Sequence, residues 1–175
     1  MQRLRVANIT TDSIVDGQGL RLVVFTQGCK RRCKGCHNPE THDLYGGYFM
    51  STKRIMNLLL TDPLQIGITF SGGEPFLQPK PCAEIAQFAH LKEKDVWCYT
   101  GFLYEDLLKN GKDYSPERFN FLKEIDVLVD GEFKEEEKRL NLKFKGSKNQ
   151  RIIDVKKSFE SKKTILYEFK YFYSN

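Results

Sequence analysis

Short apolar runs rich in β-branched and aromatic residues recur along the chain, and segments with helical spacing separate them. The runs predict strands, because each has strand length and turn residues near its ends. These strands are expected at Leu20–Thr26, Gln65–Phe70, Asp95–Tyr99, Asp126–Asp130 and Arg151–Asp154. The intervening segments predict helices. These helices are expected at Ser51–Leu60, Pro81–Lys92, Leu103–Leu108 and Pro116–Lys123, with Ser51 or Thr52 capping the first.

The alternation of strands and helices predicts an α/β protein whose parallel strands are joined by helical crossovers. Right-handed crossovers wrap such a sheet into a barrel or into part of one. A complete eight-stranded barrel needs about 250 residues, whereas this chain has 175. We therefore expect an incomplete (β/α) barrel with parallel strands, formed by a single domain over residues 1–175.

Unusual loops follow four of the predicted strands. A cysteine-rich loop follows the first strand, and the others carry SGGEP (Ser71–Pro75), YTG (Tyr99–Gly101) and VDGEF (Val129–Phe133). In parallel α/β folds the chemistry gathers on loops at the carboxyl ends of the strands. All four loops are therefore expected at one end of the sheet, where they can build a single site.

The charge and hydropathy of the chain exclude several classes of protein. Its 28 basic and 23 acidic side chains leave a formal net charge of +5, without one long basic tract. No nucleic-acid-binding motif accompanies this excess, so we expect no nucleic-acid partner. No apolar run approaches the roughly 20 residues of a membrane span. The first stretch, MQRLRVANITTD, lacks the apolar core of a signal peptide, so we expect a cytoplasmic protein without a membrane contact.

Three of the five cysteines crowd into one short stretch. Cys29, Cys33 and Cys36 have the spacing C-x3-C-x2-C, which lets a compact loop aim three thiolates at one face of an iron–sulfur cube. Cubane clusters usually take four cysteines. Three cysteines leave one iron open for a substrate, as catalytic metal sites keep an open position. The spacing therefore favours a catalytic four-iron, four-sulfur cluster.

A zinc site is the competing interpretation of this stretch, with His37 or His42 as the fourth ligand. Zinc ligands usually come as two separated pairs, which favours the cluster. Cys82 and Cys98 lie apart in apolar stretches, and we expect them to be buried structural residues. An odd number of cysteines argues against a disulfide framework.

Positive side chains interleave with the three cysteines. They are Lys30, Arg31, Arg32 and Lys34. Positive charge is expected to favour the thiolate form, and it could tune the potential of a cluster or meet an acidic partner. The alternative is that these side chains are ordinary solvated charges of a loop.

The stretch QGCKRRCKGCHNPET (residues 27–41) resembles the cluster-binding loop of radical S-adenosylmethionine enzymes. The preceding DGQGLRLVVFTQGC is similar to the first strand of the activating enzymes of glycyl-radical proteins, and SGGEP matches the motif that holds the methionine amino group. DVLVDGEF and FKGSKNQRIIDV are similar to the activating proteins of anaerobic ribonucleoside-triphosphate reductases. The resemblance covers residues 12–155 and implies an incomplete barrel of the radical S-adenosylmethionine type.

This resemblance implies two cofactors, a 4Fe-4S cluster on the three cysteines and S-adenosylmethionine. S-adenosylmethionine would chelate the open iron, and the reduced cluster would cleave it into methionine and a 5′-deoxyadenosyl radical. The radical would take a hydrogen atom from a glycine of the partner, an anaerobic ribonucleoside-triphosphate reductase. A reduced flavodoxin-like protein is implied as the electron donor.

Residues that match the family's motifs are implied to bind S-adenosylmethionine. Gly72 and Gly73 would let the backbone approach the methionine end, because neither carries a Cβ. Glu74 would accept hydrogen bonds from the ammonium group. Backbone contacts to the adenine are implied for Gly35, Cys36 and His37, although many family members carry an aromatic residue in place of Gly35. The candidates for the ribose or the carboxylate are Thr100, Asp130 and Asn149.

Two alternatives to this function remain. Activating enzymes of other glycyl-radical proteins, such as pyruvate formate-lyase, contain stretches similar to CHN and DGQG, but they are usually longer. A zinc-binding or electron-transfer module is the alternative outside enzymes, and the SGGEP stretch counts against it.

The tail beyond Val155 departs from the family's short end, so residues 156–175 are expected to form a C-terminal extension. Thr164–Tyr173 (TILYEFKYFY) is β-prone and aromatic, which predicts an edge strand packed on the core. A surface for the partner is the alternative for this segment.

Overall fold

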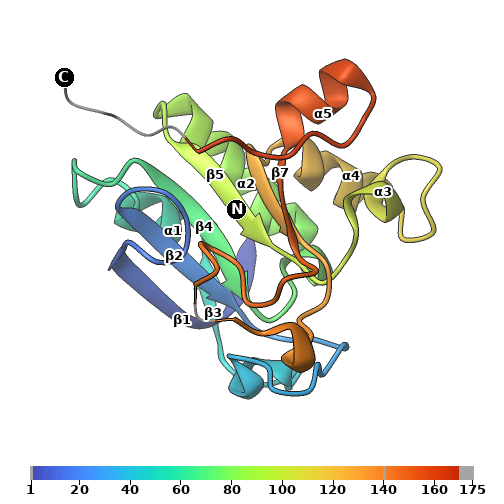
Figure 1. The fold of residues 1–175 in the computed structure, drawn as a ribbon. Coiled ribbons are helices and arrows are strands. Elements are labelled where there is room, and N and C mark those ends of the chain that lie inside the picture. Colours follow the sequence, from blue (N-terminus) through green and yellow to red (C-terminus); the bar gives the residue numbers. More distant parts are fainter. Residues whose placement is uncertain (1, 140, 170–175) are drawn as a thin grey trace.

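Seven strands form one sheet in the described residues, 2–139 and 141–169 of a computed structural model (Figure 1). Across the sheet the strands lie in the order β3-β1-β2-β4-β5-β6-β7. Their bounds are β1 Arg3–Ser13, β2 Arg21–Thr26, β3 Tyr48–Ser51, β4 Gly67–Gly72, β5 Asp95–Tyr99, β6 Val127–Asp130 and β7 Arg151–Asp154. The protein is therefore a mixed α/β protein, and all five predicted strands are confirmed.

The four central strands run parallel, as the alternation of strands and helices predicted. β2, β4, β5 and β6 pair in parallel, with Val23 opposite Thr69 and Thr69 opposite Trp97. The outer strands run antiparallel to their neighbours: β1 to both β2 and β3, and β7 to β6. The expectation of parallel strands is wrong for these outer strands, because they return to the sheet through loops and short 3-10 turns instead of a crossover helix.

Five α-helices flank the strands within the described part of the chain: α1 Thr52–Leu58, α2 Pro79–Leu91, α3 Tyr104–Leu107, α4 Pro116–Lys123 and α5 Val155–Ser161. Ser51 caps α1 as predicted, because its hydroxyl accepts the Arg54 N–H at 3.3 Å. All four predicted helices are confirmed, whereas α5 was not predicted. None of the described helices has the length and apolar composition needed to cross a membrane.

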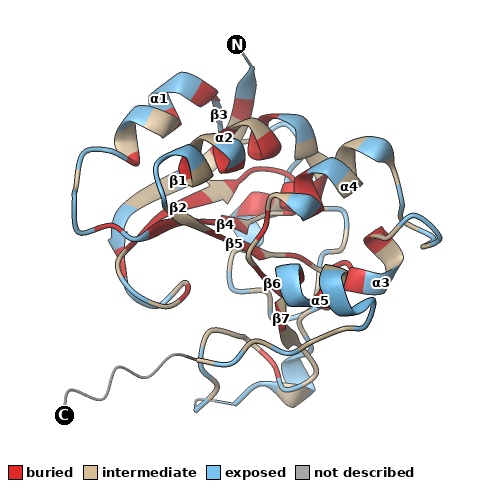
Figure 2. Cartoon of the chain, turned by 90° about the horizontal axis from the view of Figure 1, so that it is seen from above, coloured by how far each residue is buried: buried red, intermediate tan, exposed pale blue. Residues whose placement is uncertain are grey.

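The two faces of the sheet differ in what covers them (Figure 2). α1, α2 and α4 lie along one face, where Phe70 of β4 and Cys98 of β5 join them in the main hydrophobic core. The next residue on each strand, Ser71 and Tyr99, instead lines a cavity on the other face. Side chains alternate between the two faces along a strand, so the same strands build the core on one side and the site on the other.

The chain returns to the second face of the sheet after α5. A single bridge joins Leu166 to Ile153 of β7. Thr164–Phe169 otherwise has no regular strand, so the predicted edge strand is wrong over these residues, and residues 170–173 lie outside the described part. The Asp154 N–H donates to the Ile165 carbonyl at 2.9 Å and the Tyr167 N–H to the Ile152 carbonyl at 2.8 Å, so backbone hydrogen bonds to β7 and aromatic side chains together hold the tail.

Four aromatic residues, Trp97, Phe144, Tyr167 and Phe169, form what we call the inner aromatic cluster. Trp97 is fully buried, and its ring lies 5.6 Å from that of Phe144 and 5.5 Å from that of Tyr167. The Phe169 ring completes the cluster at 5.4 Å from Tyr167 and 5.7 Å from Phe144. The pairs Trp97–Phe144, Trp97–Tyr167 and Tyr167–Phe169 are edge-to-face, an arrangement that stabilises a fold beyond the burial of its area.

Replacing Tyr167 with alanine is expected to open Trp97 to solvent, because the tyrosine ring packs directly on the indole. Trp97 is the sole tryptophan of the chain, so tryptophan fluorescence reports on the surroundings of this one indole. Iodide should quench the variant more strongly than the unaltered protein. Leu166→Ala is the matched control, since the neighbouring Leu166 is 59% exposed. Equal quenching of both variants would show that the tail does not shield the indole.

Candidate active site

A cavity of about 470 Å³ opens at the carboxyl ends of the parallel strands. All four loops expected to meet there contribute to its lining. Cys29 comes from the loop after β2, Gly73 from the loop after β4, Thr100 from the loop after β5, and Gly131 from the loop after β6. The prediction that these loops build one site is confirmed.

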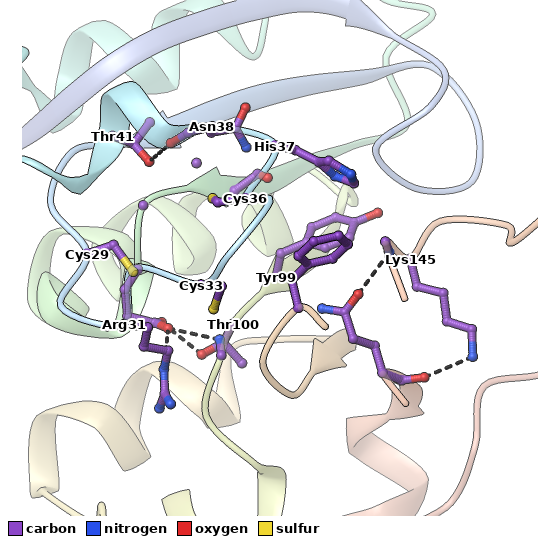
Figure 3. Close-up of a pocket in the computed structure, with 18 of the residues that line it drawn as sticks. Cys29, Arg31, Cys33, Cys36, His37, Asn38, Thr41, Tyr99, Thr100 and Lys145 are labelled. Carbon is purple, nitrogen blue, oxygen red and sulfur yellow. Dashed lines mark hydrogen bonds and ion pairs between the residues drawn. The ribbon is translucent and has the colours of Figure 1, made fainter. Parts of the chain in front are cut away.

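One loop brings three thiols to this cavity (Figure 3). Cys29, Cys33 and Cys36 are all partly buried and free of disulfides. Each contributes to the lining, together with Arg31 of the same loop. Cys82 and Cys98 are fully buried in the main core, as predicted for structural residues.

A short 3-10 helix, Pro39–His42, fixes where the cysteine loop begins. The carbonyl oxygens of Thr41 and His42 accept the N–H groups of Gly28 and Cys29, at 2.9 and 3.3 Å. These two hydrogen bonds hold the first thiol at the cavity. The loop is therefore tied at its base by the residues that follow it in the sequence.

The donor set, three thiols of one loop around one cavity, suits an iron–sulfur cluster. Within residues 2–139 and 141–169, no three Cys, His, Asp or Glu side chains converge on one point that could hold a metal ion. In a cubane cluster each thiolate binds a different iron, so three thiols spread around a cavity suit it. Of the two histidines weighed as zinc ligands, His37 instead packs on Phe133, with ring centroids 4.8 Å apart.

Burial raises the pKa of the Cys29 and Cys33 thiols, which is the opposite of the direction expected from the basic loop. The backbone N–H of Arg31 opposes this rise at Cys29, and that of Phe133 opposes it at Cys33. A thiol that binds a metal ion is deprotonated by the metal itself. Binding at these two residues would therefore release protons.

Gly72 and Gly73 allow the SGGEP loop to pack directly on the base of the cysteine loop. Gly72 has φ +84°, a conformation that residues with a Cβ rarely adopt. A Cβ on Gly73 would lie 2.5 Å from the Gly28 carbonyl oxygen. The Gly73 N–H donates to the Thr26 carbonyl at 2.8 Å, so the approach is bonded as well as close. The two glycines thus have a structural role that the sequence did not indicate.

The carboxylate of Glu74 is almost fully buried and joins three segments of the site. Its Oε1 accepts the Thr100 hydroxyl at 2.8 Å and the Phe76 N–H at 3.1 Å, and its Oε2 accepts the Gly101 N–H at 2.9 Å. Burial raises the pKa of Glu74, although these hydrogen bonds oppose the rise. Charge-assisted hydrogen bonds of this kind are strong, so Glu74 fixes the loop after β5 against the loop after β4.

The remaining candidate residues differ in their access to the cavity. Cys36, His37 and Thr100 line it, whereas Gly35, Asp130 and Asn149 are not among its lining residues. The Asp130 carboxylate is fully buried, accepts the Tyr104 N–H at 2.8 Å, and pairs with Arg151. Asn149 donates to the Glu132 carbonyl at 2.8 Å, and its own side-chain oxygen is buried without a hydrogen-bond partner.

Gln150 lines the cavity but was not predicted as a site residue. Its Nε2 donates to the Gly131 carbonyl at 2.9 Å, and its Oε1 accepts the N–H groups of Gly146 and Ser147 at 2.8 and 3.1 Å. The glutamine therefore ties the turn before β7 to the loop after β6. Its position directly after FKGSKN was the available signal in the sequence.

Comparison with known proteins agrees with this site. Residues 15–153 match the family described as a 4Fe-4S single cluster domain. The anaerobic ribonucleoside-triphosphate reductase-activating protein of Enterobacteria phage T4 is 34% identical over 79% of this chain and 86% of its own length. The protein of that name from Vibrio cholerae is also 34% identical, over 79% of this chain and 90% of its own. The pyruvate formate-lyase-activating enzyme of Clostridium pasteurianum is 38% identical, over 61% of this chain and 48% of its own length.

The family match extends over residues 15–153 and so includes the three cysteines, the SGGEP loop and the loop after β6. The matches with the two reductase-activating proteins span most of this chain and also most of the length of each relative. The chain therefore belongs to the 4Fe-4S single cluster domain family that includes the anaerobic ribonucleoside-triphosphate reductase-activating proteins.

Proposed function

We propose that this chain activates an anaerobic ribonucleoside-triphosphate reductase. It would do so as a radical S-adenosylmethionine enzyme, with a 4Fe-4S cluster on Cys29, Cys33 and Cys36. The activated form of the partner would carry a radical on one glycine. A reduced flavodoxin-like protein is the proposed electron donor.

The observation that carries this proposal is the convergence of the cysteine loop and the SGGEP loop on one cavity. A cluster with three protein ligands leaves an iron open, and a second cofactor must then be held beside it. The glycines and Glu74 lie on the loop that packs against the cysteine loop. This arrangement supports S-adenosylmethionine as the neighbouring cofactor.

When bound, the cluster supplies one electron that breaks a carbon–sulfur bond of S-adenosylmethionine, giving methionine and a 5′-deoxyadenosyl radical. The protein's own residues orient the reactants and exclude water. Ser71 and Tyr99 line the floor of the cavity from the sheet, and the inner aromatic cluster lies beside them through Phe144. The hydrogen atom lost by the partner's glycine would complete 5′-deoxyadenosine.

The contacts to S-adenosylmethionine are proposed at two ends of the cavity. The methionine end is assigned to Gly72, Gly73 and Glu74, and the adenine end to the backbone of Gly35, Cys36 and His37. The contact between the His37 and Phe133 rings, which are tilted by 50° to each other, supports an aromatic surface at the adenine end. Thr100 is favoured over Asp130 and Asn149 for the remaining polar contact, since Thr100 lines the cavity.

Activation of pyruvate formate-lyase is the second candidate function, because one such activating enzyme is also similar to this chain. The match with this chain covers 48% of that relative's length, whereas it covers 86% and 90% of the two reductase-activating relatives. The difference in coverage favours the reductase as the partner.

We further propose that the sheet is an incomplete barrel of the radical S-adenosylmethionine type and that residues 1–175 form one domain. The family match ends at residue 153, which supports residues 156–175 as a C-terminal extension. All five cysteines lie in the described part of the chain and are free thiols, which supports a reducing compartment such as the cytoplasm.

The test is an anaerobic reconstitution with iron and sulfide, followed by reduction and addition of S-adenosylmethionine. The expected products are 5′-deoxyadenosine and, with the reductase present, a glycyl radical seen by electron paramagnetic resonance. A parallel reaction with pyruvate formate-lyase separates the two candidate partners. A protein that holds zinc and forms no cluster would overturn the proposal.

A further inference from the structure

Arg31 lies where the four loops of the site meet. Its side chain crosses Gly101 so closely that a Cβ there would lie 2.2 Å from the Arg31 Cδ. The guanidinium carbon is 4.3 Å from the centre of the Phe102 ring. Its Nη1 pairs with Glu132, and its Nε lies 3.8 Å from the Glu74 carboxylate. One side chain of the cysteine loop thus contacts the loops after β4, β5 and β6.

Two carboxylates stand close to the cysteines, and Arg31 pairs with both. Glu74 lines the same cavity as the three thiols, and Glu132 lies between the lining residues Gly131 and Phe133. Both carboxylates therefore add negative charge beside the proposed cluster site. A bound cluster with its thiolates would add to this negative charge. The arginine is the positive group placed between them.

The other basic residues of the cysteine loop are more exposed to solvent than Arg31. Lys30, Arg32 and Lys34 are exposed, and the Lys34 side chain is 91% exposed in its pair with Glu135. Exposed pairs of this kind contribute little. The Arg31 side chain is only 22% exposed and lies flat on an aromatic ring. Its planar guanidinium suits a stacked and bridging position that lysine could not reproduce.

We propose that Arg31 is a positioning residue that locks the cysteine loop onto the other three loops and raises the reduction potential of the cluster. The inference rests on the proposed function, since it requires that a cluster be bound. A nearby positive charge favours the reduced state of a cluster, which carries one more negative charge. Arg31 therefore makes the cluster easier for its protein donor to reduce.

The first test compares the cluster's midpoint potential in the unaltered protein, Arg31→Gln and Arg32→Gln. The titration is followed by electron paramagnetic resonance, without S-adenosylmethionine or partner. Arg31→Gln is expected to shift the potential to a more negative value. Arg32→Gln is the matched control, because it removes an equal charge from the adjacent, exposed position. It should leave the potential unchanged.

A variant of the acidic partner distinguishes an effect of charge on the potential from an effect of a distorted loop. Glu132→Gln removes the negative partner of Arg31 and should shift the potential to a more positive value. In the double variant of Arg31→Gln and Glu132→Gln the two opposite shifts should largely cancel, and any departure from their sum measures the coupling between the two side chains. Arg31→Lys keeps the positive charge, so its midpoint potential should lie closer to that of the unaltered protein than the potential of Arg31→Gln does. A purely structural lesion would not give shifts of opposite sign.

Loss of iron to a chelator measures the locking role. Arg31→Gln should lose its cluster roughly tenfold faster or more, as is typical when a residue that supports metal ligands is removed. Arg32→Gln should lose iron at the unaltered rate. Equal potentials or equal iron loss in these two variants would overturn the inference. An unaltered protein that binds no cluster would instead overturn the proposed function, and this inference with it.

Discussion

Replacing Cys36 with alanine is expected to abolish cleavage of S-adenosylmethionine. The variant keeps two of the three thiols that surround the cavity, and two thiols cannot anchor a cubane cluster on three irons. Its iron content after reconstitution should fall, and 5′-deoxyadenosine should be undetectable. Cys36 lies in a loop outside the hydrophobic core, so the far-ultraviolet circular dichroism spectrum should not change.

Cys82→Ser is the control for the loss of a cysteine as such. Cys82 is fully buried in α2, and its sulfur faces the Pro75 carbonyl at 3.9 Å, to which a serine hydroxyl can donate. This variant should retain its iron and its activity. Loss of iron from Cys82→Ser would mean that the ligands had been wrongly assigned. Full activity of Cys36→Ala would contradict the assignment of the cluster to the cysteine loop.

Replacing Gly73 is expected to have the second largest effect. A methyl group at this position would lie 2.5 Å from the Gly28 oxygen and 3.0 Å from the Thr26 oxygen. Both are backbone atoms of the segment that leads into Cys29, so the SGGEP loop and the cysteine loop must move apart. Gly73→Ala should destabilise the fold by about 1–3 kcal/mol, as overpacking usually does. Gly73→Val should have the larger effect.

Gly73→Ala should lower the reaction rate and the affinity for S-adenosylmethionine more than it lowers the stability of the fold. A displacement of about 1 Å between reacting groups can lower a rate roughly 100-fold, and this substitution separates the two loops that would hold the cofactors. Urea unfolding gives the change in stability, and equilibrium dialysis with labelled S-adenosylmethionine gives the change in affinity. An unchanged affinity would show that the approach of Gly73 to Gly28 does not shape the binding site.

Gly46→Ala provides the control for adding a methyl group to a loop near the same cavity. A Cβ there would meet the Gln27 side-chain nitrogen at 2.9 Å, and a shift of this side chain would loosen its hydrogen bonds to the Glu40 and Asp43 carbonyls. Its stability should therefore fall, but its affinity for S-adenosylmethionine should remain close to that of the unaltered protein. A loss of affinity as large as that of Gly73→Ala would indicate general sensitivity of the loops.

The central strands were predictable because local pattern and tertiary environment agree there. Asp95–Tyr99 is an apolar strand buried on both sides of the sheet, and its bounds are as predicted. β1, in contrast, was not predicted, although polar and apolar side chains alternate over Arg3–Val6 as in a half-buried strand. It pairs with β2 and β3 on its two sides, and its own periodicity does not encode which strands become its partners.

Asp130 is a residue of the site region whose interaction partner was likewise not evident from the local sequence. The resemblance to the family made it a candidate for the ribose or carboxylate of S-adenosylmethionine. Its carboxylate instead pairs with Arg151, which stands opposite it in the register of β6 and β7. The antiparallel pairing of these strands decided the partner, because it brings together residues that are 21 positions apart in the chain.

The sequence by itself determined the chemical identity of the site. The spacing of Cys29, Cys33 and Cys36 limits the ligand chemistry to a metal or a cluster, and the order of strands and loops puts SGGEP beside them. Both are properties of neighbours in the chain, which spacing and periodicity describe directly.

Only the tertiary structure decided how the four loops are joined. Glu74 is bonded to Thr100 and Gly101, Arg31 pairs with Glu132, and the tail packs its Tyr167 ring on Trp97. Each contact joins segments that lie far apart in the sequence. Their geometry depends on the twist, register and loop paths of the whole sheet, and these are fixed by packing that no local pattern contains.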